Sequence, residues 1–315
     1  MLAALASADA VTWLSIFIKA LAYAATLSAV GAVLVMASLR ELSEGGRTSL
    51  SRTAALSAFA AAIFIALRLP LHASFLMGGT WHGAFDPIIL GMVAKSPLGT
   101  SAALRISGLV LIPLVTWRKR VGLWLALLGA LLASASFALR GHALGEPKMI
   151  LGMLITLHIL CLAFWIGAFA PLIRSTMFES SARVGILAHE FSSQALWVVG
   201  LLILAGGATL ALLGAITPSV LSIPYGQIFA IKLILFAGVL LLAAGNKLLL
   251  TPALLASKPG ANARLRRSIC VEAALVVGIL VTTAVLTTVS SPPNKVRSEQ
   301  ASFISPPLRS QNGLG

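Results

Sequence analysis

The sequence predicts an all-α protein, a polytopic transmembrane bundle of about eight helices. Of its 315 residues, 58% are hydrophobic and only 10% are charged, whereas soluble domains are roughly 25% charged. One helical crossing of a bilayer takes about 20 apolar residues, so this content suffices for about eight crossings and leaves little for an aqueous domain. The apolar stretches lack the two-residue alternation of an outer-membrane barrel, and a helix satisfies its own backbone hydrogen bonds in lipid.

Eight apolar stretches follow one another along the chain. They are residues 11–39, 53–76, 99–117, 121–139, 149–173, 195–216, 227–250 and 268–289. The segment before the first stretch carries no basic residue and the stretch is too long for a signal-peptide core, so we expect it to be retained as the first helix. We divide the chain into an N-terminal four-helix half (1–139), a C-terminal half (140–290) and a disordered periplasmic tail (291–315), which is polar and proline-containing.

The basic residues predict the orientation. Thirteen of the 23 Lys and Arg residues fall in the alternate loops one, three, five and seven: Arg40, Arg47, Arg52, Arg118, Lys119, Arg120, Arg174, Arg183, Lys247, Lys258, Arg264, Arg266 and Arg267. Cytoplasmic loops collect basic residues, so these loops are expected to be cytoplasmic and both termini to face a periplasm. The net charge of +14 is then explained by topology, and no nucleic-acid partner is expected.

Several functional classes find no support in the sequence. Cys161 and Cys270 both lie in apolar runs, which gives neither a disulfide framework nor a zinc pattern. The chain has no phosphate-binding Gly-x-x-x-x-Gly-Lys-Ser/Thr loop, no His-Glu-x-x-His helix and no strand-turn-helix around a serine. We therefore expect a protein that is not an enzyme and does not itself use ATP.

Soft metal ligands gather on the predicted outer side. Three histidines lie there, one lies inside the fifth helix and one is cytoplasmic; in that order they are His72, His82 and His142, then His158, then His189. Met77, Met92, Met149 and Met153 belong to the outer region as well. Imidazole and thioether groups suit Cu(I), whereas magnesium or calcium would need several carboxylates. The segment 72–82 offers His72, Met77 and His82 as ligands; alternatively, the methionines are packing residues and His82 is a solvated loop residue.

His158 is the strongest single candidate, because a polar ring deep in an apolar helix is expensive without a partner. Cys161 and Trp165 follow at plus three and plus seven, so all three share one helix face. Cys161 is a candidate copper ligand, although a buried cysteine is more commonly a small apolar filler.

Four charged residues also lie within the apolar stretches. Lys19, Arg105 and Lys232 are close enough to helix ends for their side chains to reach the membrane surface. Glu272 lies a turn inside the cytoplasmic end of the last stretch, where Asn246, Lys247 and Arg267 are candidate partners. An internal ion pair and a proton relay both remain open for it.

The chain resembles the CopD/PcoD copper resistance membrane proteins. The resemblance is most specific in the C-terminal half, in five segments: 140–143 (Arg-Gly-His-Ala), 157–158 with 165–167 (Leu-His and Trp-Ile-Gly), 224–233, 246–247, and 265–268 with Glu272 and 291–293. The first half matches more loosely, at 85–87 and around Gly99 and Leu104-Arg105.

This resemblance implies an eight-helix bacterial inner-membrane protein that moves copper, commonly described as uptake, and works with a periplasmic CopC-like copper-binding protein. It also carries Lys232 and Glu272 over as family positions. We predict that His72, Met77 and His82 receive copper at the outer face, and that His142 and His158 form the next site inward. Cys161 and Met153 are further candidate ligands, and Lys232, Glu272, Trp165 and Arg105 support transport.

Two other functions remain open. Histidines on facing helices can hold a haem iron, so a membrane redox protein is one alternative. A membrane partner that binds a CopC-like protein without moving ions is the other. The direction of transport does not follow from the sequence, because outer ligands suit both capture and release.

Overall fold

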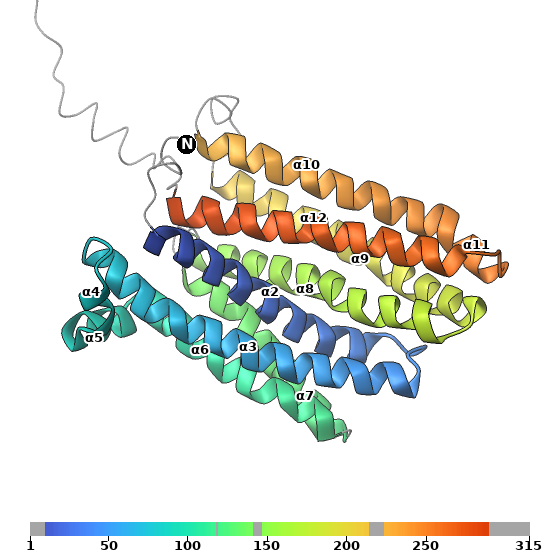
Figure 1. Cartoon of the computed structure of the whole chain (residues 1–315), viewed down its shortest axis with the longest axis horizontal. Coiled ribbons are helices and arrows are strands. Elements are labelled where there is room, and N and C mark those ends of the chain that lie inside the picture. Colours follow the sequence, from blue (N-terminus) through green and yellow to red (C-terminus); the bar gives the residue numbers. More distant parts are fainter. Residues whose placement is uncertain (1–9, 118, 141–146, 214–223, 290–315) are drawn as a thin grey trace, which may run out of the picture.

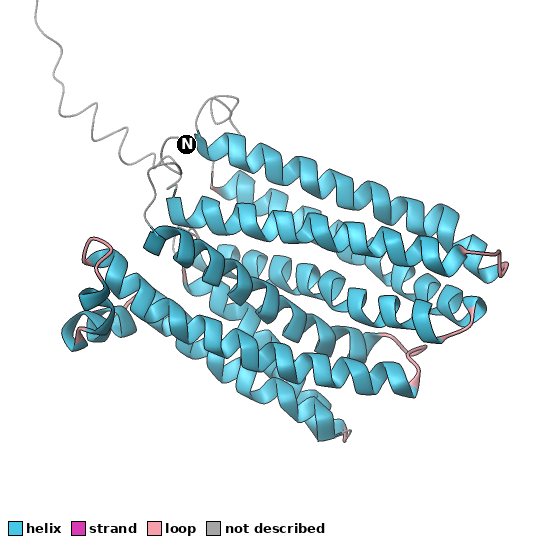
Figure 2. Ribbon diagram, in the orientation of Figure 1, coloured by secondary structure: helices cyan, strands magenta, loops and turns pink. Residues whose placement is uncertain are grey.

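The computed structural model describes residues 10–117, 119–140, 147–213 and 224–289. Within these residues the chain is almost entirely helical and contains no strand, as Figure 2 shows. Eight helical segments are long and apolar enough to cross a membrane. The predicted polytopic helical bundle is therefore confirmed, and Figure 1 shows its helices running roughly along one common direction.

The N-terminal half contains four spanning segments and a short excursion between the second and third. The elements are α2 (Ala10–Ser38), α3 (Glu44–Leu76), α4 (Trp81–Phe85), α5 (Pro87–Lys95), α6 (Pro97–Leu111), η1 (Ile112–Trp117), α7 (Arg120–Ala135) and η2 (Ser136–Leu139). Asp86 and Ser96 cap α5 and α6 by accepting hydrogen bonds from backbone N–H groups, and a proline follows each cap.

The C-terminal half contains the other four spanning segments. The elements are α8 (Lys148–Phe178), α9 (Ser181–Leu212), α10 (Pro224–Gly245), the π-helical η5 (Asn246–Leu250), α11 (Thr251–Leu255) and α12 (Ala261–Val289). Three helices begin well before the predicted apolar stretch: α3 by nine residues, α9 by fourteen and α12 by seven. Hydropathy marks only the part suited to lipid, whereas the backbone remains helical through the polar turns that precede it.

The predicted basic loops meet at one end of the bundle. In Figure 1 the α2–α3, α8–α9 and α11–α12 connections and the start of α7 lie at the right, whereas α4, α5 and the ends of α3 and α12 lie at the left. We call these the loop end and the α4 end. The alternation on which the orientation rests is thus present, and the assignment of the loop end to the cytoplasm stays a prediction. The predicted tail, residues 291–315, lies outside the described residues.

Helix α2 joins the two halves, because it packs against α3 and α7 on one side and against α8 and α12 on the other. At its crossing with α8 the two backbones touch. A Cβ added to Gly31 would overlap with the Ala163 carbonyl oxygen and lie 2.8 Å from the Gly167 nitrogen. Glycine at both positions is what permits this approach.

Glu190 fixes the turn between α2 and α3. Its carboxylate accepts hydrogen bonds from the backbone N–H groups of Arg40 (2.8 Å) and Glu41 (3.0 Å). We expect Glu190→Ala to lower the free energy of unfolding by about 1.5 kcal/mol, because two donors lose a charged acceptor. The thermal unfolding midpoint of the detergent-purified protein measures this.

The matched control is Glu41→Ala. It removes an exposed ion pair with Arg183 (3.6 Å), and such pairs contribute about 0–1 kcal/mol. Equal destabilisation by the two substitutions would contradict the assigned role of Glu190.

Candidate functional site

One face of α8 carries the predicted His158, Cys161 and Trp165. The structure places the His158 ring against Gly206 of α9, where an added Cβ would lie 3.3 Å from Nδ1. Lys232 of α10 lies within electrostatic range of this ring, and the Leu202 backbone lies close enough to interact with it as a hydrogen-bonding group. The ring nitrogen Nδ1 is buried and has no hydrogen-bond partner. Imidazole nitrogen in this state can accept a metal or a proton.

Further along the same face, Trp165 meets the carboxylate of Glu272 on α12. Glu272 is 4% exposed and accepts a short hydrogen bond from the Asn246 side-chain amide, so Asn246 is confirmed as its partner. The Trp165 Nε1 lies near this carboxylate without completing a hydrogen bond. Phe191 of α9 packs edge-on against the indole, with 6.4 Å between ring centroids.

The structure places Glu272 deeper than the sequence suggested. It lies eleven residues after the start of α12, which is about 16 Å along the helix. The other two candidate partners face elsewhere: Lys247 donates to the Ser192 carbonyl oxygen (3.5 Å), and Arg267 is exposed. Glu272 is the only buried carboxylate among the described residues.

The unpartnered polar atoms of the described chain concentrate on this face. Four buried side-chain atoms of the described residues lack a hydrogen-bond partner. Three of them, His158 Nδ1, Trp165 Nε1 and Asn246 Oδ1, belong to this region, and the fourth, Asn262 Oδ1, lies near the start of α12. Each such atom costs roughly 1–3 kcal/mol if it stays buried without a partner, so these positions are candidates for binding a water or an ion. We call His158, Cys161, Trp165, Asn246 and Glu272 the α8 stripe.

The predicted outer ligands are not brought together into one site. His72 stacks on Phe75 (6.3 Å between ring centroids) and lies within electrostatic range of Arg140, Arg68 and Lys19. His82 on α4 is exposed, and the Met77 side chain packs against Gly83. His142 lies outside the described residues.

Met153 lies on a different face of α8. It is 69% exposed and lines a groove of about 620 Å³ with Met149, Leu157 and Leu160. No group of three or more His, Cys, Asp or Glu side chains that could hold a metal occurs in the described ranges. The individual ligand assignments therefore stay predictions.

The sequence suggested that the side chains of Arg105 and Lys19 reach the membrane surface, but both are buried inside the protein. Arg105 is 3% exposed; its Nε donates to Ser136 Oγ (2.7 Å), and its guanidinium lies 3.5 Å from the Phe137 ring centroid. Lys19 is also buried, and its Nζ donates to the Thr287 carbonyl oxygen (2.9 Å) near the end of α12. Both cations are therefore held by hydrogen-bond acceptors inside the protein and do not need to extend to water.

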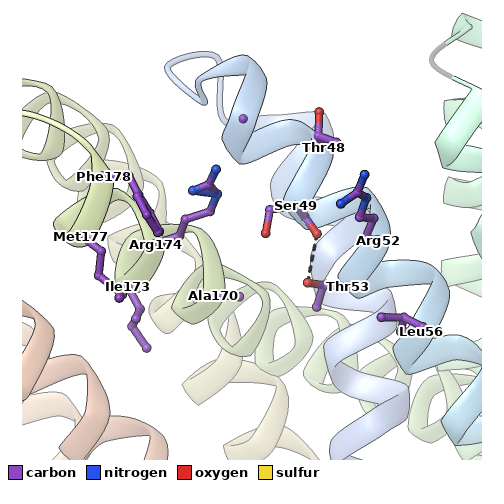
Figure 3. Close-up of a pocket in the computed structure, with 11 residues that line it drawn as sticks. Thr48, Ser49, Arg52, Thr53, Leu56, Ala170, Ile173, Arg174, Met177 and Phe178 are labelled. Atoms are coloured by element: carbon purple, nitrogen blue, oxygen red, sulfur yellow. Dashed lines mark hydrogen bonds between the residues drawn. The ribbon is translucent and has the colours of Figure 1, made fainter.

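A second groove, of about 780 Å³, lies at the loop end between α3 and α8. Figure 3 shows Arg174 beside Phe178 on one wall and Arg52 with Thr53 on the other. Met177 is the only soft ligand type in its lining. The groove is therefore separate from the α8 stripe and offers no copper site of its own.

Comparison with known proteins relates the chain to copper proteins. The family model "Copper resistance protein D" matches residues 186–286, and "Copper resistance protein D-like, N-terminal domain" matches residues 7–153. Helix positions His158, Cys161 and Trp165 fall between the two matched ranges. No solved structure matches the chain.

A curated relative points the same way. The chain is 28% identical over 244 residues to the copper transport protein CutJ of Bacillus subtilis (strain 168). The match covers 72% of this chain and 43% of that protein, so the chain spans less than half the length of this relative. The two family models together cover most of the chain in the order expected for one protein, and the chain belongs to the copper resistance protein D family.

Proposed function

We propose that this protein conducts copper, as Cu(I), across a bacterial inner membrane, from the periplasm to the cytoplasm and without ATP. The observation that carries the proposal is the α8 stripe, with a buried, unpartnered imidazole nitrogen on His158 and a thiol three residues further along. Imidazole and thiolate are ligands that soft Cu(I) prefers. The family and the relative's name support copper as the ion.

The charge distribution favours the C-terminal half as the path. At the α4 end of the N-terminal half, the charges of Lys19, Arg68, Arg105 and Arg140 all act on Tyr23, and a cation would be repelled there. The stripe instead leads from His158 to the carboxylate of Glu272, whose negative charge suits a passing cation. We place Met77 and His82 as the first outer ligands and His158 with Cys161 as the inner site.

A CopC-like periplasmic protein is the proposed donor of copper. The short helices α4 and α5 project at the α4 end (Figure 1) and expose Trp81, Phe85, Ile88 and Met92. Aromatic and methionine side chains are common at protein interfaces. We propose this segment as the surface that receives the donor.

The function is tested with purified full-length protein in liposomes that enclose a Cu(I)-sensitive dye. When copper is added outside under reducing conditions, we expect the dye signal to rise faster than in protein-free liposomes. Added K⁺ or Mg²⁺ should produce no signal. The proposal would be overturned if the dye signal did not rise with the protein inserted in either orientation. A stoichiometric Soret band in the purified protein would instead favour a haem protein, and donor binding without uptake would favour a non-transporting partner.

Glu272 provides a sharper test of the path. We expect Glu272→Gln to lower the initial rate of copper uptake at least about tenfold, equivalent to about 1.4 kcal/mol in the barrier. The amide removes the charge but still accepts a hydrogen bond from Asn246, so the fold should be retained. The measurement is the initial slope of the dye signal at fixed protein density.

Glu41→Gln is the matched control, because it removes a carboxylate that is partly exposed at the loop end. Its rate should equal that of the wild type. If Glu272→Gln also transports at the wild-type rate, the carboxylate has no part in conduction.

A further inference from the structure

A cluster of basic side chains lies inside the N-terminal half at the α4 end. Lys19, Arg68, Arg105 and Arg140 come from α2, α3, α6 and the residue after η2, and all four act electrostatically on Tyr23 of α2. Arg68 is 9% exposed, and Lys19 and Arg105 are still less exposed. We call these five residues the basic cluster.

Two of the four cations have partners within the protein. Lys19 Nζ donates to the Thr287 carbonyl oxygen and to Thr288 Oγ1 (3.1 Å). Arg105 donates to Ser136 Oγ and lies over the Phe137 ring. These interactions are with neutral groups, so they orient the cations without cancelling their charge.

The other two cations are unpartnered. Neither Arg68 nor Arg140 makes a hydrogen bond or an ion pair in the described structure, although Arg68 is about nine-tenths buried. Burial lowers the pKa of Arg140 below its usual value and the charge of Arg68 lowers it further, whereas Tyr23 raises it. A guanidinium carries five donors in a planar fork, and on Arg68 none of them is used.

No described carboxylate compensates the cluster. Four of the six described acids, Glu41, Glu44, Glu179 and Glu190, lie at the loop end, and Glu272 is held by Asn246 in the other half. Asp86 is the one acid at the α4 end among the described residues, and its carboxylate caps α5 by accepting from the N–H groups of Ile88 and Ile89. Buried charge is normally paired, and none of the six described carboxylates supplies a counter-charge to the cluster.

We propose that the basic cluster is an anion-binding site for a phosphate-type oxyanion, held by Arg68 and Arg140 with Tyr23 beside them. Guanidinium groups bind phosphate oxygens in a bidentate manner with charge-assisted hydrogen bonds. The Tyr23 hydroxyl can donate one more hydrogen bond. A bound anion would relieve the repulsion among the four cations, so binding should stabilise the fold.

The position of the site allows two sources for the oxyanion. Arg68 lies eight residues before the end of α3, and Arg140 directly follows η2, so the site is about 12 Å or less from the end of the bundle along α3. A phospholipid headgroup could reach it from the adjoining leaflet, and a free phosphate ion could reach it from the aqueous side.

The test measures thermal unfolding of the purified full-length protein in a neutral detergent. One series adds sodium phosphate against sodium chloride at equal ionic strength, and a second adds short-chain phosphatidylglycerol. We expect one of the two ligands to raise the unfolding midpoint with saturation. Phosphate acting alone identifies a free anion, and phosphatidylglycerol acting alone identifies a headgroup; either result supports the site.

Arg68→Gln should lower the affinity for the ligand that raises the midpoint at least about tenfold, equivalent to about 1.4 kcal/mol. Arg266→Gln, an exposed arginine at the loop end of α12, is the control and should leave the midpoint shift unchanged. If Arg68→Gln does not fold, Arg140→Gln replaces it with the same expected loss of affinity. Arg140 is only half-buried, so its replacement should be tolerated by the fold. No midpoint shift with either ligand, or the same affinity in the cluster variants as in the wild type, would overturn the proposal. Copper is absent throughout, so the outcome does not depend on the proposed transport.

Discussion

Replacing Gly167 with valine is expected to destabilise the protein by more than about 3 kcal/mol, at the upper end of the cost of overpacking. Gly167 lies where α8 crosses α2, and a Cβ there would overlap with the Gly31 backbone. A backbone cannot rotate away as a side chain can, so the two helices must separate. The yield of monodisperse protein and the thermal unfolding midpoint measure the effect.

Gly200→Val is the matched control for this substitution. Gly200 lies in the middle of α9, and a Cβ added there meets no atom within 4 Å. Both variants change helix propensity equally, so the difference between them isolates the crossing. A Gly167→Val protein as stable as Gly200→Val would show that the α2–α8 contact does not join the two halves.

The spanning helices could be predicted from the sequence because lipid leaves a chain few alternatives. An apolar stretch of sufficient length has to form a helix, and spacing alone put His158, Cys161 and Trp165 on one face. The sequence also put Asn246 among three candidate partners of Glu272, and the structure selects Asn246. The short helices α4 and α5 were expected only as a loop, although Asp86-Pro87 and Ser96-Pro97 are typical of helix starts.

The basic cluster could not be predicted in this way. Nothing in the sequence indicates that Arg68, Tyr23 and Arg140 share a site. Their convergence depends on how α2, α3 and α6 rotate and cross, which is decided by contacts such as those of Gly31 and not by periodicity. The one local signal is the spacing of Lys19 and Tyr23, which are four residues apart and so share a helix face.

The same limitation applies to the outer ligands. His72, Met77 and His82 are close in sequence, which suggested one site. The structure turns His72 toward the basic cluster, whereas His82 lies exposed on α4. Short sequence separation across a helix end does not fix the relative direction of side chains. The described residues therefore do not form a single centre from these three side chains.

His158→Ala is expected to reduce copper uptake into liposomes to the rate of protein-free liposomes. Loss of groups that only support a metal ligand typically costs roughly 10–100-fold, and loss of a ligand should cost more. His158 offers a buried nitrogen that no protein group occupies, and the nearby Lys232 opposes long residence of a cation beside it. Such a site suits passage of an ion more than storage, so the defect should appear in the rate of uptake.

Two controls separate conduction from folding. His189→Ala removes an exposed histidine on α9 and should transport at the wild-type rate. His158→Gln keeps a polar side chain of similar length against Gly206, so it should fold as the wild type does while still failing to bind Cu(I), because a carboxamide is a poor soft ligand. Wild-type uptake by a folded His158→Gln protein would exclude His158 as a ligand and would move the path away from this face of α8. Loss of uptake in His158→Gln together with retention in His189→Ala would instead tie conduction to the His158 imidazole, whose Nδ1 is buried.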